Sequence, residues 1–278
     1  MKIILGTVQW GLNYGISNKN GIPSINELNE ILSFAKTEGI KMLDTASSYG
    51  DAEQKIGDNA KGEFDIITKI GTSSMTCSIE EELKCSLKKL KRESVYGCLF
   101  HDVNNLLKNP SIWNEMLELK KLGLIKKIGY SLYHPDELKK LLSLDFVPDL
   151  IQIPFNLVDR RFEPYLKELK KMKTEIHARS IFLQGLLLNF EMMGERKFVN
   201  WQQIWGEYKQ WLNFSELSPI EACISHVSSY GCISKLVVGI DNLLQLKEII
   251  LASKKKSVRA PKSLLSSDNN LINPQSWV

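Results

Sequence analysis

Four polar residues in the first part of the chain have types that suit acid–base chemistry. Asp44 ends a short apolar run, Tyr49 follows in the next loop, and Lys69 and His101 come at the ends of the next two apolar runs. Titratable groups that converge beside buried strands are a marker of functional sites. The sequence therefore predicts a recessed site that contains Asp44, Tyr49, Lys69 and His101.

Together these side chains could give a proton to a carbonyl oxygen while a hydride reaches the carbon. A phenol such as Tyr49 has an ordinary pKa of about 10, and a nearby ammonium group favours its ionised form. We expect Lys69 to lower the pKa of Tyr49 in this way, and Asp44 to fix the position and charge of Lys69. His101 would donate a hydrogen bond to the same oxygen. Tyr49 and His101 are therefore also candidates for substrate binding.

The elements that must position these residues alternate along the chain. Strands are predicted at 3–7, 42–46, 65–70, 96–103, 127–131, 150–155, 175–181 and 235–240. Apolar residues at three- and four-residue spacing predict helices at 24–39, 78–92, 109–123, 134–144 and 162–173. Short apolar strands between amphipathic helices indicate a parallel sheet covered by helices. Eight units favour an α/β fold closed into a (β/α)₈ TIM barrel over an open doubly wound sheet.

The regular alternation breaks between the seventh and eighth strands. Residues 197–214 are predicted to form an extra helical insertion with an aromatic stripe, consisting of Trp201, Trp205, Tyr208 and Trp211 or Leu212. A second helix is predicted at 218–231. The stripe fits a substrate lid or a partner face, but packing against the barrel wall is favoured because aromatic stripes usually pack. The tail, 257–278, is predicted to be loop-like and could cross one mouth of the barrel. Residues 1–278 are predicted to form a single domain.

Composition excludes several classes of function. The net charge of +4 is mild and the lysines fall mainly in helical patterns, which argues against a nucleic-acid surface. The five cysteines (Cys77, Cys85, Cys98, Cys223 and Cys232) include no CxxC pair, which indicates free thiols in a reducing compartment and no zinc site. No apolar run approaches the roughly 20 residues of a membrane span, and the start is too short for a signal peptide. We expect a cytoplasmic protein without a metal, and its oligomeric state stays open.

The chain resembles the aldo/keto reductase superfamily over nearly its whole length. LDTASSYGDAE (43–53) resembles the family's aspartate-to-tyrosine signature, and ITK and LFHD match the positions of its lysine and histidine. The resemblance implies an NAD(P)H-dependent oxidoreductase that reduces an aldehyde or ketone to an alcohol, with Asp44, Tyr49, Lys69 and His101 as the catalytic tetrad. A histidine at 101, rather than the glutamate of steroid double-bond reductases, points to carbonyl reduction.

The same resemblance implies residues that bind the cofactor. Ser131 and Gln152, in GYS and LIQIPFN, would bind the nicotinamide carboxamide, although Leu132 replaces the family's usual asparagine. Arg179 stands where an aromatic residue often stacks on the nicotinamide, and a guanidinium can also stack on a planar ring. Further candidates along the cofactor are Gly6, Thr7, Asp44, Ser180, Leu183 and Gly185. Trp10 is read either as a substrate-wall aromatic or as a core tryptophan.

The adenine end departs from the family pattern. VVGIDNLLQL (237–246) aligns with a segment whose basic residues usually grip a 2′-phosphate, yet Asp241 lies there. An aspartate would repel a 2′-phosphate and could accept a hydrogen bond from a free ribose hydroxyl. The usual cofactor of the family is therefore a reason to expect NADPH, whereas the charge of Asp241 favours NADH. The adenosine-side candidates are Gly239, Asp241 and Gln245, with Lys235 as a further possibility.

Two other functions compete with carbonyl reduction. A catalytically weak barrel could bind the nicotinamide cofactor as a sensor or subunit, because fold alone does not determine function. A hydrolase or isomerase would need a metal cluster or a nucleophile–base pair, and the sequence offers neither. The partner expected for a reductase is a small-molecule carbonyl substrate, whose identity the sequence leaves open.

Overall fold

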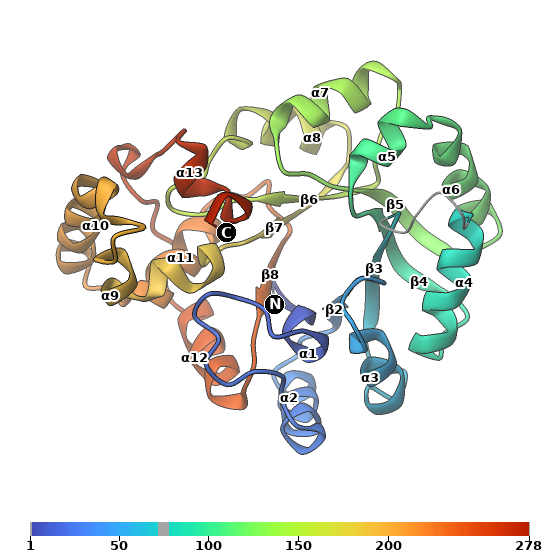
Figure 1. The fold of residues 1–278 in the computed structure, drawn as a ribbon, viewed down its shortest axis with the longest axis horizontal. Helices are drawn as coiled ribbons and strands as arrows, with labels where there is room; N and C mark the ends of the chain where they lie inside the picture. The colour runs from blue at the N-terminus through green and yellow to red at the C-terminus, as the bar shows by residue number, and fades with distance from the viewer. Residues whose placement is uncertain (1, 72–77, 278) are drawn as a thin grey trace.

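The protein is a closed barrel of eight parallel strands that pair in chain order, with β8 completing the circle against β1 (Figure 1). The computed structural model describes residues 2–71 and 78–277, so Cys77 lies outside the described residues. The strands are β1 (Ile3–Gly6), β2 (Met42–Asp44), β3 (Asp65–Ile70), β4 (Val95–Phe100), β5 (Ile125–Ser131), β6 (Leu150–Pro154), β7 (Glu175–Arg179) and β8 (Lys235–Gly239). The predicted (β/α)₈ barrel is confirmed.

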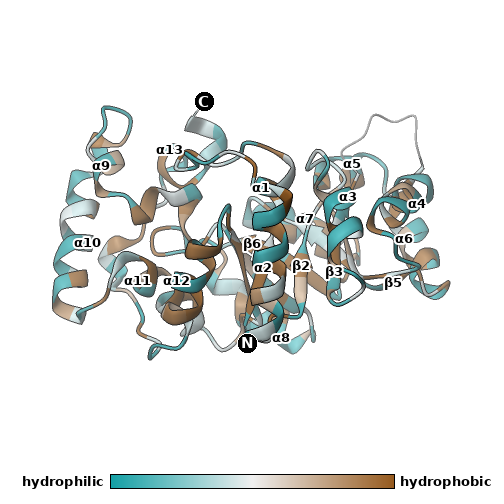
Figure 2. Cartoon of the chain, turned by 90° about the horizontal axis from the view of Figure 1, so that it is seen from below, coloured by the Kyte–Doolittle hydropathy of each residue, from teal (hydrophilic) through white to brown (hydrophobic). Residues whose placement is uncertain are grey.

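Helices between the strands cover the outside of the barrel. The predicted helices appear as α2 (Ile25–Thr37), α4 (Ile79–Leu90), α6 (Ser111–Lys121), α7 (Pro135–Ser143) and α8 (Leu166–Lys171), the last preceded by the 3-10 turn η1 (Glu163–Tyr165). Sequence patterns did not predict four helices, which are α1 (Val8–Gly11), α3 (Ala52–Asn59), α5 (Val103–Lys108) and α12 (Leu243–Ser253). Figure 2 shows mainly hydrophilic residues on the visible side of α2. None of the helices within 2–71 and 78–277 is long and apolar enough to cross a membrane.

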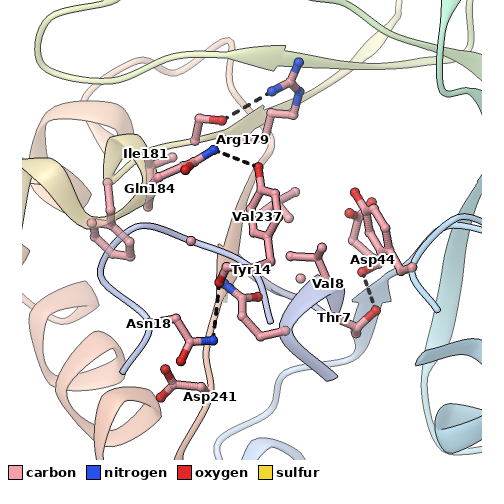
Figure 3. Close-up of a pocket in the computed structure, with 18 of the residues that line it drawn as sticks. Thr7, Val8, Tyr14, Asn18, Asp44, Arg179, Ile181, Gln184, Val237 and Asp241 are labelled. Carbon is pink, nitrogen blue, oxygen red and sulfur yellow. Dashed lines mark hydrogen bonds between the residues drawn. The ribbon is translucent and has the colours of Figure 1, made fainter. Parts of the chain in front are cut away.

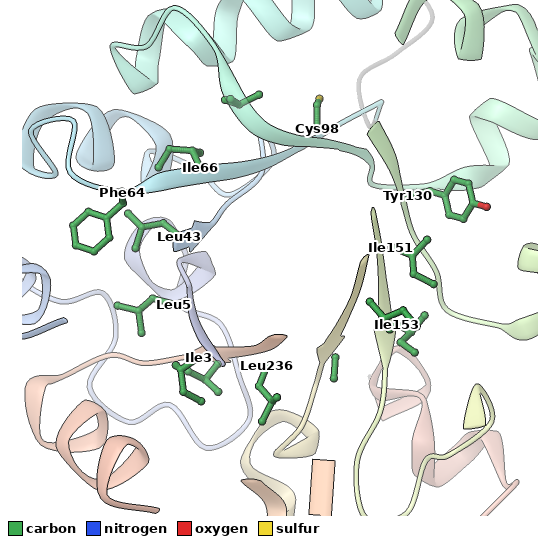
Figure 4. Close-up of a cluster of buried hydrophobic side chains, with 14 of the residues drawn as sticks. Ile3, Leu5, Leu43, Phe64, Ile66, Cys98, Tyr130, Ile151, Ile153 and Leu236 are labelled. Carbon is green, nitrogen blue, oxygen red and sulfur yellow. The ribbon is translucent and has the colours of Figure 1, made fainter. Parts of the chain in front are cut away.

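Two apolar layers hold the barrel together, one inside it and one between strands and helices. Ile3 and Leu5 face the helices, and Ile4 between them faces the barrel interior, because side chains alternate along a strand. Figure 4 shows part of the outer layer. The inner layer contains Ile4, Met42, Ile67, Leu99, Leu150 and Val237. This layer closes the middle of the barrel, so space for a ligand remains only at its ends.

The segment between β7 and β8, which includes the predicted insertion 197–214, forms a second apolar cluster on one side of the barrel. This segment contains η2 (Leu183–Leu188), α9 (Phe190–Met193), η3 (Val199–Trp201), α10 (Gln202–Ser215) and α11 (Pro219–Ser228). Trp205 and Tyr208 are buried, and their polar atoms donate to Phe198 O (2.9 Å) and Leu187 O (3.0 Å). The aromatic stripe therefore packs, as its favoured interpretation predicted.

The tail is partly helical, contrary to the loop that we expected. It contains η4 (Lys262–Leu264), α13 (Asn269–Ile272) and η5 (Pro274–Trp277). Trp277 lies edge-on against Phe198, 5.0 Å between ring centres, so the tail packs on the insertion (Figure 1). None of its described residues lines the cavity at the barrel mouth. The apolar residues of the tail are too sparse to show a helical period, so the sequence did not predict its short helices.

A polar cluster lies at the amino-terminal end of the barrel. Glu175 accepts hydrogen bonds from Tyr96 Oη (2.7 Å) and Lys127 Nζ, and a third joins it to His177 Nε2 (2.6 Å). Burial alone would raise the pKa of Glu175, but the hydrogen bonds from His177 and Lys127 outweigh it and lower the pKa to about 2. The native state therefore holds this carboxylate in its charged form.

The low pKa of Glu175 predicts a loss of stability in acid. A folded pKa of about 2, below the ordinary 4.5, stabilises the native state above pH 4.5, and this contribution is lost as the pH falls toward 2. Between pH 6 and pH 3 we expect wild type to lose about 2 kcal/mol more unfolding free energy than Glu175→Gln. Urea unfolding of both proteins across this range measures the difference. Parallel pH profiles would show that Glu175 is not responsible.

Candidate active site

A cavity of about 570 Å³ opens at the carboxyl ends of the strands (Figure 3). Its walls contain many of the predicted site residues, which are Gly6, Thr7, Asp44, Tyr49, Lys69, His101, Ser131, Gln152, Arg179, Ser180, Gly185, Gly239, Asp241 and Gln245. The carboxyl ends of barrel strands are where loops can vary without disturbing the core. The structure thus brings residues from all eight strand ends to one place.

The alternation of side chains explains why these residues meet. Each inner-layer residue is followed, two positions later on the same strand or just past its end, by a residue that lines the cavity. These pairs are Ile4 and Gly6, Met42 and Asp44, Ile67 and Lys69, Leu99 and His101, Leu150 and Gln152, and Val237 and Gly239. The cavity floor is therefore the next layer of the barrel interior.

Asp44 and Lys69 form a buried ion pair at this floor. Lys69 Nζ lies 2.5 Å from Asp44 Oδ2 and donates a second hydrogen bond to Thr45 O (2.9 Å). Asp44 is 3% exposed and Lys69 1% exposed. Burial lowers the pKa of Lys69 and the charge of Asp44 opposes this, with a net lowering. The positive charge of Lys69 is thus largely compensated by the carboxylate of Asp44.

Tyr49 lies beside this pair and beside His101. Lys69 Nζ is 5.2 Å from the centre of the Tyr49 ring, and the rings of Tyr49 and His101 meet edge-on at 5.6 Å. Burial and the charge of Asp44 raise the pKa of Tyr49 well above its ordinary value, while Arg179 lowers it. The expectation of a lowered pKa was wrong, because burial and the charge of Asp44 oppose the ionisation of Tyr49. Tyr49 keeps its proton at neutral pH, which is the form that a proton donor needs.

His101 is held neutral in the cavity wall. Burial, followed by the charges of Lys69 and Arg179, lowers the pKa of His101 to about 3. A hydrogen bond of 3.2 Å joins Ser48 Oγ to His101 Nδ1. When Ser48 donates in this bond, the ring proton lies on Nε2 and can be donated to a ligand. Ser48 was missed in the sequence, where it is one of two adjacent serines in a turn.

Gln152 has a side-chain oxygen that fits a hydrogen-bond donor on a ligand. Its Nε2 donates to Asp44 Oδ1, while its Oε1 is buried and has no hydrogen-bond partner among the described residues. Ser131 lies next to it in the register of β5 and β6 and also lines the cavity. A buried acceptor without a donor is costly. The amide group of a nicotinamide ring would supply that donor, so these residues fit the implied cofactor.

Arg179 lies in the cavity wall at the end of β7. Its Nη2 donates to Leu132 O (2.8 Å), its Nη1 donates to Ser180 Oγ (3.3 Å), and its Cζ lies 4.3 Å from the centre of the Tyr133 ring. Among the residues that the structure describes, it has no ion-pair partner. The backbone carbonyl of Leu132 therefore helps to hold Arg179 in the cavity wall.

A segment that the sequence patterns did not single out crosses the cavity. It follows α1 and contributes Leu12, Tyr14, Gly15, Ser17 and Asn18 to the wall. Ser17 Oγ donates to Gln184 O (3.2 Å), and Gln184 Nε2 donates to Tyr14 Oη (3.1 Å), a bond drawn in Figure 3. We call residues 12–21 the strap. Its composition, LNYGISNKNG, carries only a turn signal.

The strap also reaches the predicted adenosine end. Asn20 Nδ2 donates to Asp241 Oδ1 (3.2 Å), and Asn242 Nδ2 donates to the same oxygen (2.7 Å). Gln245 Oε1 accepts from Asp241 N (3.1 Å), and Glu248, missed in the sequence, lines the cavity nearby. Within the described part of the chain, Lys69 and Arg179 are the only lysine or arginine in the cavity wall. This end of the cavity is therefore acidic.

Trp10 is a core residue and does not line the cavity. Its side chain is 0% exposed and belongs to the cluster between the strands and the helices. The short helix α1 packs tightly against the turn that carries Tyr49, since a Cβ on Gly11 would lie 1.9 Å from Tyr49 O. Lys55 Nζ also donates to Trp10 O (2.8 Å). The prediction of a substrate-wall aromatic was wrong, and its core alternative was right.

Two of the predicted cofactor-binding residues, Leu183 and Lys235, do not line the cavity. Leu183 is buried in the second cluster with φ +49°, and its N–H donates to Ser180 O (2.9 Å), so it neither lines the cavity nor offers a free amide. Lys235 begins β8, beside His177 in the register, and so lies at the opposite end of the barrel from Gly239. Gly185 does line the cavity, but its N–H donates to Phe182 O (3.0 Å).

The sequence matches the model of one protein family, described as the Aldo/keto reductase family, over residues 2–260. The oxidoreductase YqkF of Bacillus subtilis is 24% identical over 253 residues, which cover 82% of each chain. The methylglyoxal reductase DkgA of Yersinia pestis is 30% identical over 126 residues, or 43% of this chain and 45% of that protein.

Solved structures share the fold. The aldo-keto reductase AKR11C1 from Bacillus halodurans, in its holo form, has a TM-score of 0.72 at 20% identity, covering 92% of this chain and 88% of that one. A Bombyx mori aldo-keto reductase in complex with NADP has a TM-score of 0.68 at 20% identity, covering 92% of this chain and 85% of the other. At these identities the likeness shows the fold alone.

Proposed function

The chain belongs to the aldo/keto reductase family, and from that premise we propose that it reduces an aldehyde or ketone to an alcohol with a nicotinamide cofactor. The observation that carries the proposal is one cavity in which protonated Tyr49 and neutral His101 stand beside the buried Asp44–Lys69 pair. The unpartnered Gln152 Oε1 in the same wall supports the cofactor.

In the proposed reaction the four residues of the site together transfer one proton to the carbonyl oxygen. The bound cofactor would supply a hydride to the carbonyl carbon, and the C=O double bond becomes a C–O single bond. Tyr49 gives its proton to the oxygen as negative charge grows there. His101 donates a hydrogen bond to the same oxygen. Lys69 offsets the charge of Asp44, which uncompensated would oppose the loss of the Tyr49 proton still more strongly.

An assay of carbonyl-dependent oxidation of NADH and NADPH tests the proposal. Methylglyoxal is a suitable first substrate in a panel of aldehydes and ketones, because the Yersinia pestis relative is named as a methylglyoxal reductase. Oxidation that depends on both the carbonyl and the enzyme supports a reductase. Tight cofactor binding with no oxidation across the panel would favour the sensor or subunit instead.

We further propose that the cofactor is NADH. Asp241 and Glu248 make the adenosine end acidic, and a carboxylate a few ångströms from a 2′-phosphate costs about 1–3 kcal/mol at an effective dielectric constant of about 20–40. Wild type should therefore bind NADH at least about tenfold more tightly than NADPH. Asp241→Asn, which can still accept the hydrogen bond from Asn20, should reduce the ratio of NADH affinity to NADPH affinity. Titration calorimetry measures both affinities, and an unchanged ratio in Asp241→Asn would contradict the role of Asp241.

A further inference from the structure

Arg179 is the cation of the cavity whose charge no neighbour compensates. Lys69, the other cation in the described wall, is paired with Asp44 at 2.5 Å. Arg179 donates only to the neutral oxygens of Leu132 and Ser180, and within residues 2–71 and 78–277 it meets no carboxylate at ion-pair distance. The catalytic end of the cavity therefore carries one unbalanced positive charge.

The contacts of Arg179 also limit how a ligand can touch it. One side of the guanidinium lies over the Tyr133 ring, two of its nitrogens donate to the protein, and the third, Nε, is buried. An anion binds a guanidinium through its in-plane N–H groups. One N–H group of each terminal nitrogen is already donated to the protein and the N–H of Nε is buried, so this edge is only partly available to an anion. Arg179 lines the cavity, and the flat face of its guanidinium opposite Tyr133 suits a planar ring.

We propose that Arg179 makes this site bind the reduced nicotinamide cofactor more tightly than the oxidised one. This inference rests on the proposed function, because it concerns the same cofactor in the same cavity. The reduced nicotinamide ring is neutral, whereas the oxidised ring carries a positive charge. A fixed cation against the ring opposes only the oxidised form, and Asp44 cannot offset this because its charge is already balanced by Lys69.

The consequence is a preference for one direction of reaction. Hydride transfer turns a neutral ring into a cation beside Arg179, so the oxidised cofactor is bound weakly and leaves readily. The two forms share their phosphates, ribose and adenine, so contacts to those parts cancel in the ratio of the two affinities. Two like charges within several ångströms at a partly buried site change that ratio by about tenfold or more.

Titration calorimetry with NADH and NAD⁺, and with NADPH and NADP⁺, tests the proposal without any turnover. Wild type should bind the reduced form at least about tenfold more tightly than the oxidised form of its preferred pair. Arg179→Met, which keeps an unbranched side chain but removes the charge, should shrink this ratio by about tenfold. Arg179→Lys is the matched control, since it keeps the charge and should keep most of the ratio.

The possible results distinguish a failure of this inference about Arg179 from a failure of the proposed function. If Arg179→Met weakens both forms equally, Arg179 holds a part that the forms share, such as a phosphate, and the inference is wrong. If wild type binds the oxidised form as tightly as the reduced one, it is wrong whether or not Arg179→Met folds, and Arg179→Gln provides a second neutral variant. If folded wild type binds none of the four nucleotides, the proposed function itself fails.

Discussion

Replacing Tyr49 with phenylalanine is expected to lower the rate of carbonyl reduction by about 10²–10⁴-fold while cofactor affinity stays nearly unchanged. Phenylalanine keeps the ring that meets His101 edge-on and lies 5.2 Å from Lys69 Nζ. The lost hydroxyl has no hydrogen bond to any described residue, so the fold should not suffer. Only the proton that the proposed reaction needs is removed.

The rate constant of a single turnover, with saturating reduced cofactor, separates chemistry from product release in this test. Tyr130→Phe is the matched control, because Tyr130 is buried outside the cavity and its hydroxyl donates to Phe146 O (3.2 Å). The control should retain the rate of wild type. If Tyr49→Phe stays within tenfold of wild type, Tyr49 is not the proton donor, and persistent cofactor binding would then favour the sensor or subunit.

Much of this site could be predicted because its residues obey the period of a strand. Asp44, Lys69 and His101 each follow a short apolar run, and in a closed parallel barrel such positions converge at one mouth. The order of strands needed no further information, since each β-strand pairs with the next along the chain. The prediction that Asp44, Lys69 and His101 converge therefore rests on local spacing that the fold preserves.

The wrong predictions concern positions where the spacing of residues along the chain does not tell which way a side chain points. Trp10 lies on a helix of four residues, which is too short for an apolar face, and this helix packs tightly against the turn of Tyr49 at Gly11. Leu183 turns away because the chain takes φ +49° there, which no propensity of leucine predicts. The strap has no apolar period at all. Its place depends on side-chain bonds to Gln184 and Asp241, more than 160 residues away.

The buried pair beneath Tyr49 predicts the largest effect on stability. Lys69→Met should lower the free energy of unfolding by about 3–5 kcal/mol, because it leaves the carboxylate of Asp44 buried without its counter-charge. Asp44 would keep only the hydrogen bond from Gln152 Nε2 among its side-chain donors. The lost cation should also slow reduction, since nothing then replaces the ammonium group beside the Tyr49 ring.

A double-mutant cycle distinguishes the loss of the pair from a general packing defect. Asp44→Asn together with Lys69→Met removes both charges and keeps the shape of residue 44, so it should unfold at a higher urea concentration than Lys69→Met alone. Urea unfolding of the four proteins at neutral pH gives the coupling free energy. If the double variant is as unstable as the sum of its parts, the cost of Lys69→Met is lost packing. In that case the charge of Lys69 would not be what holds Asp44 in the barrel floor, and its role beside Tyr49 would have to be judged from the rate alone.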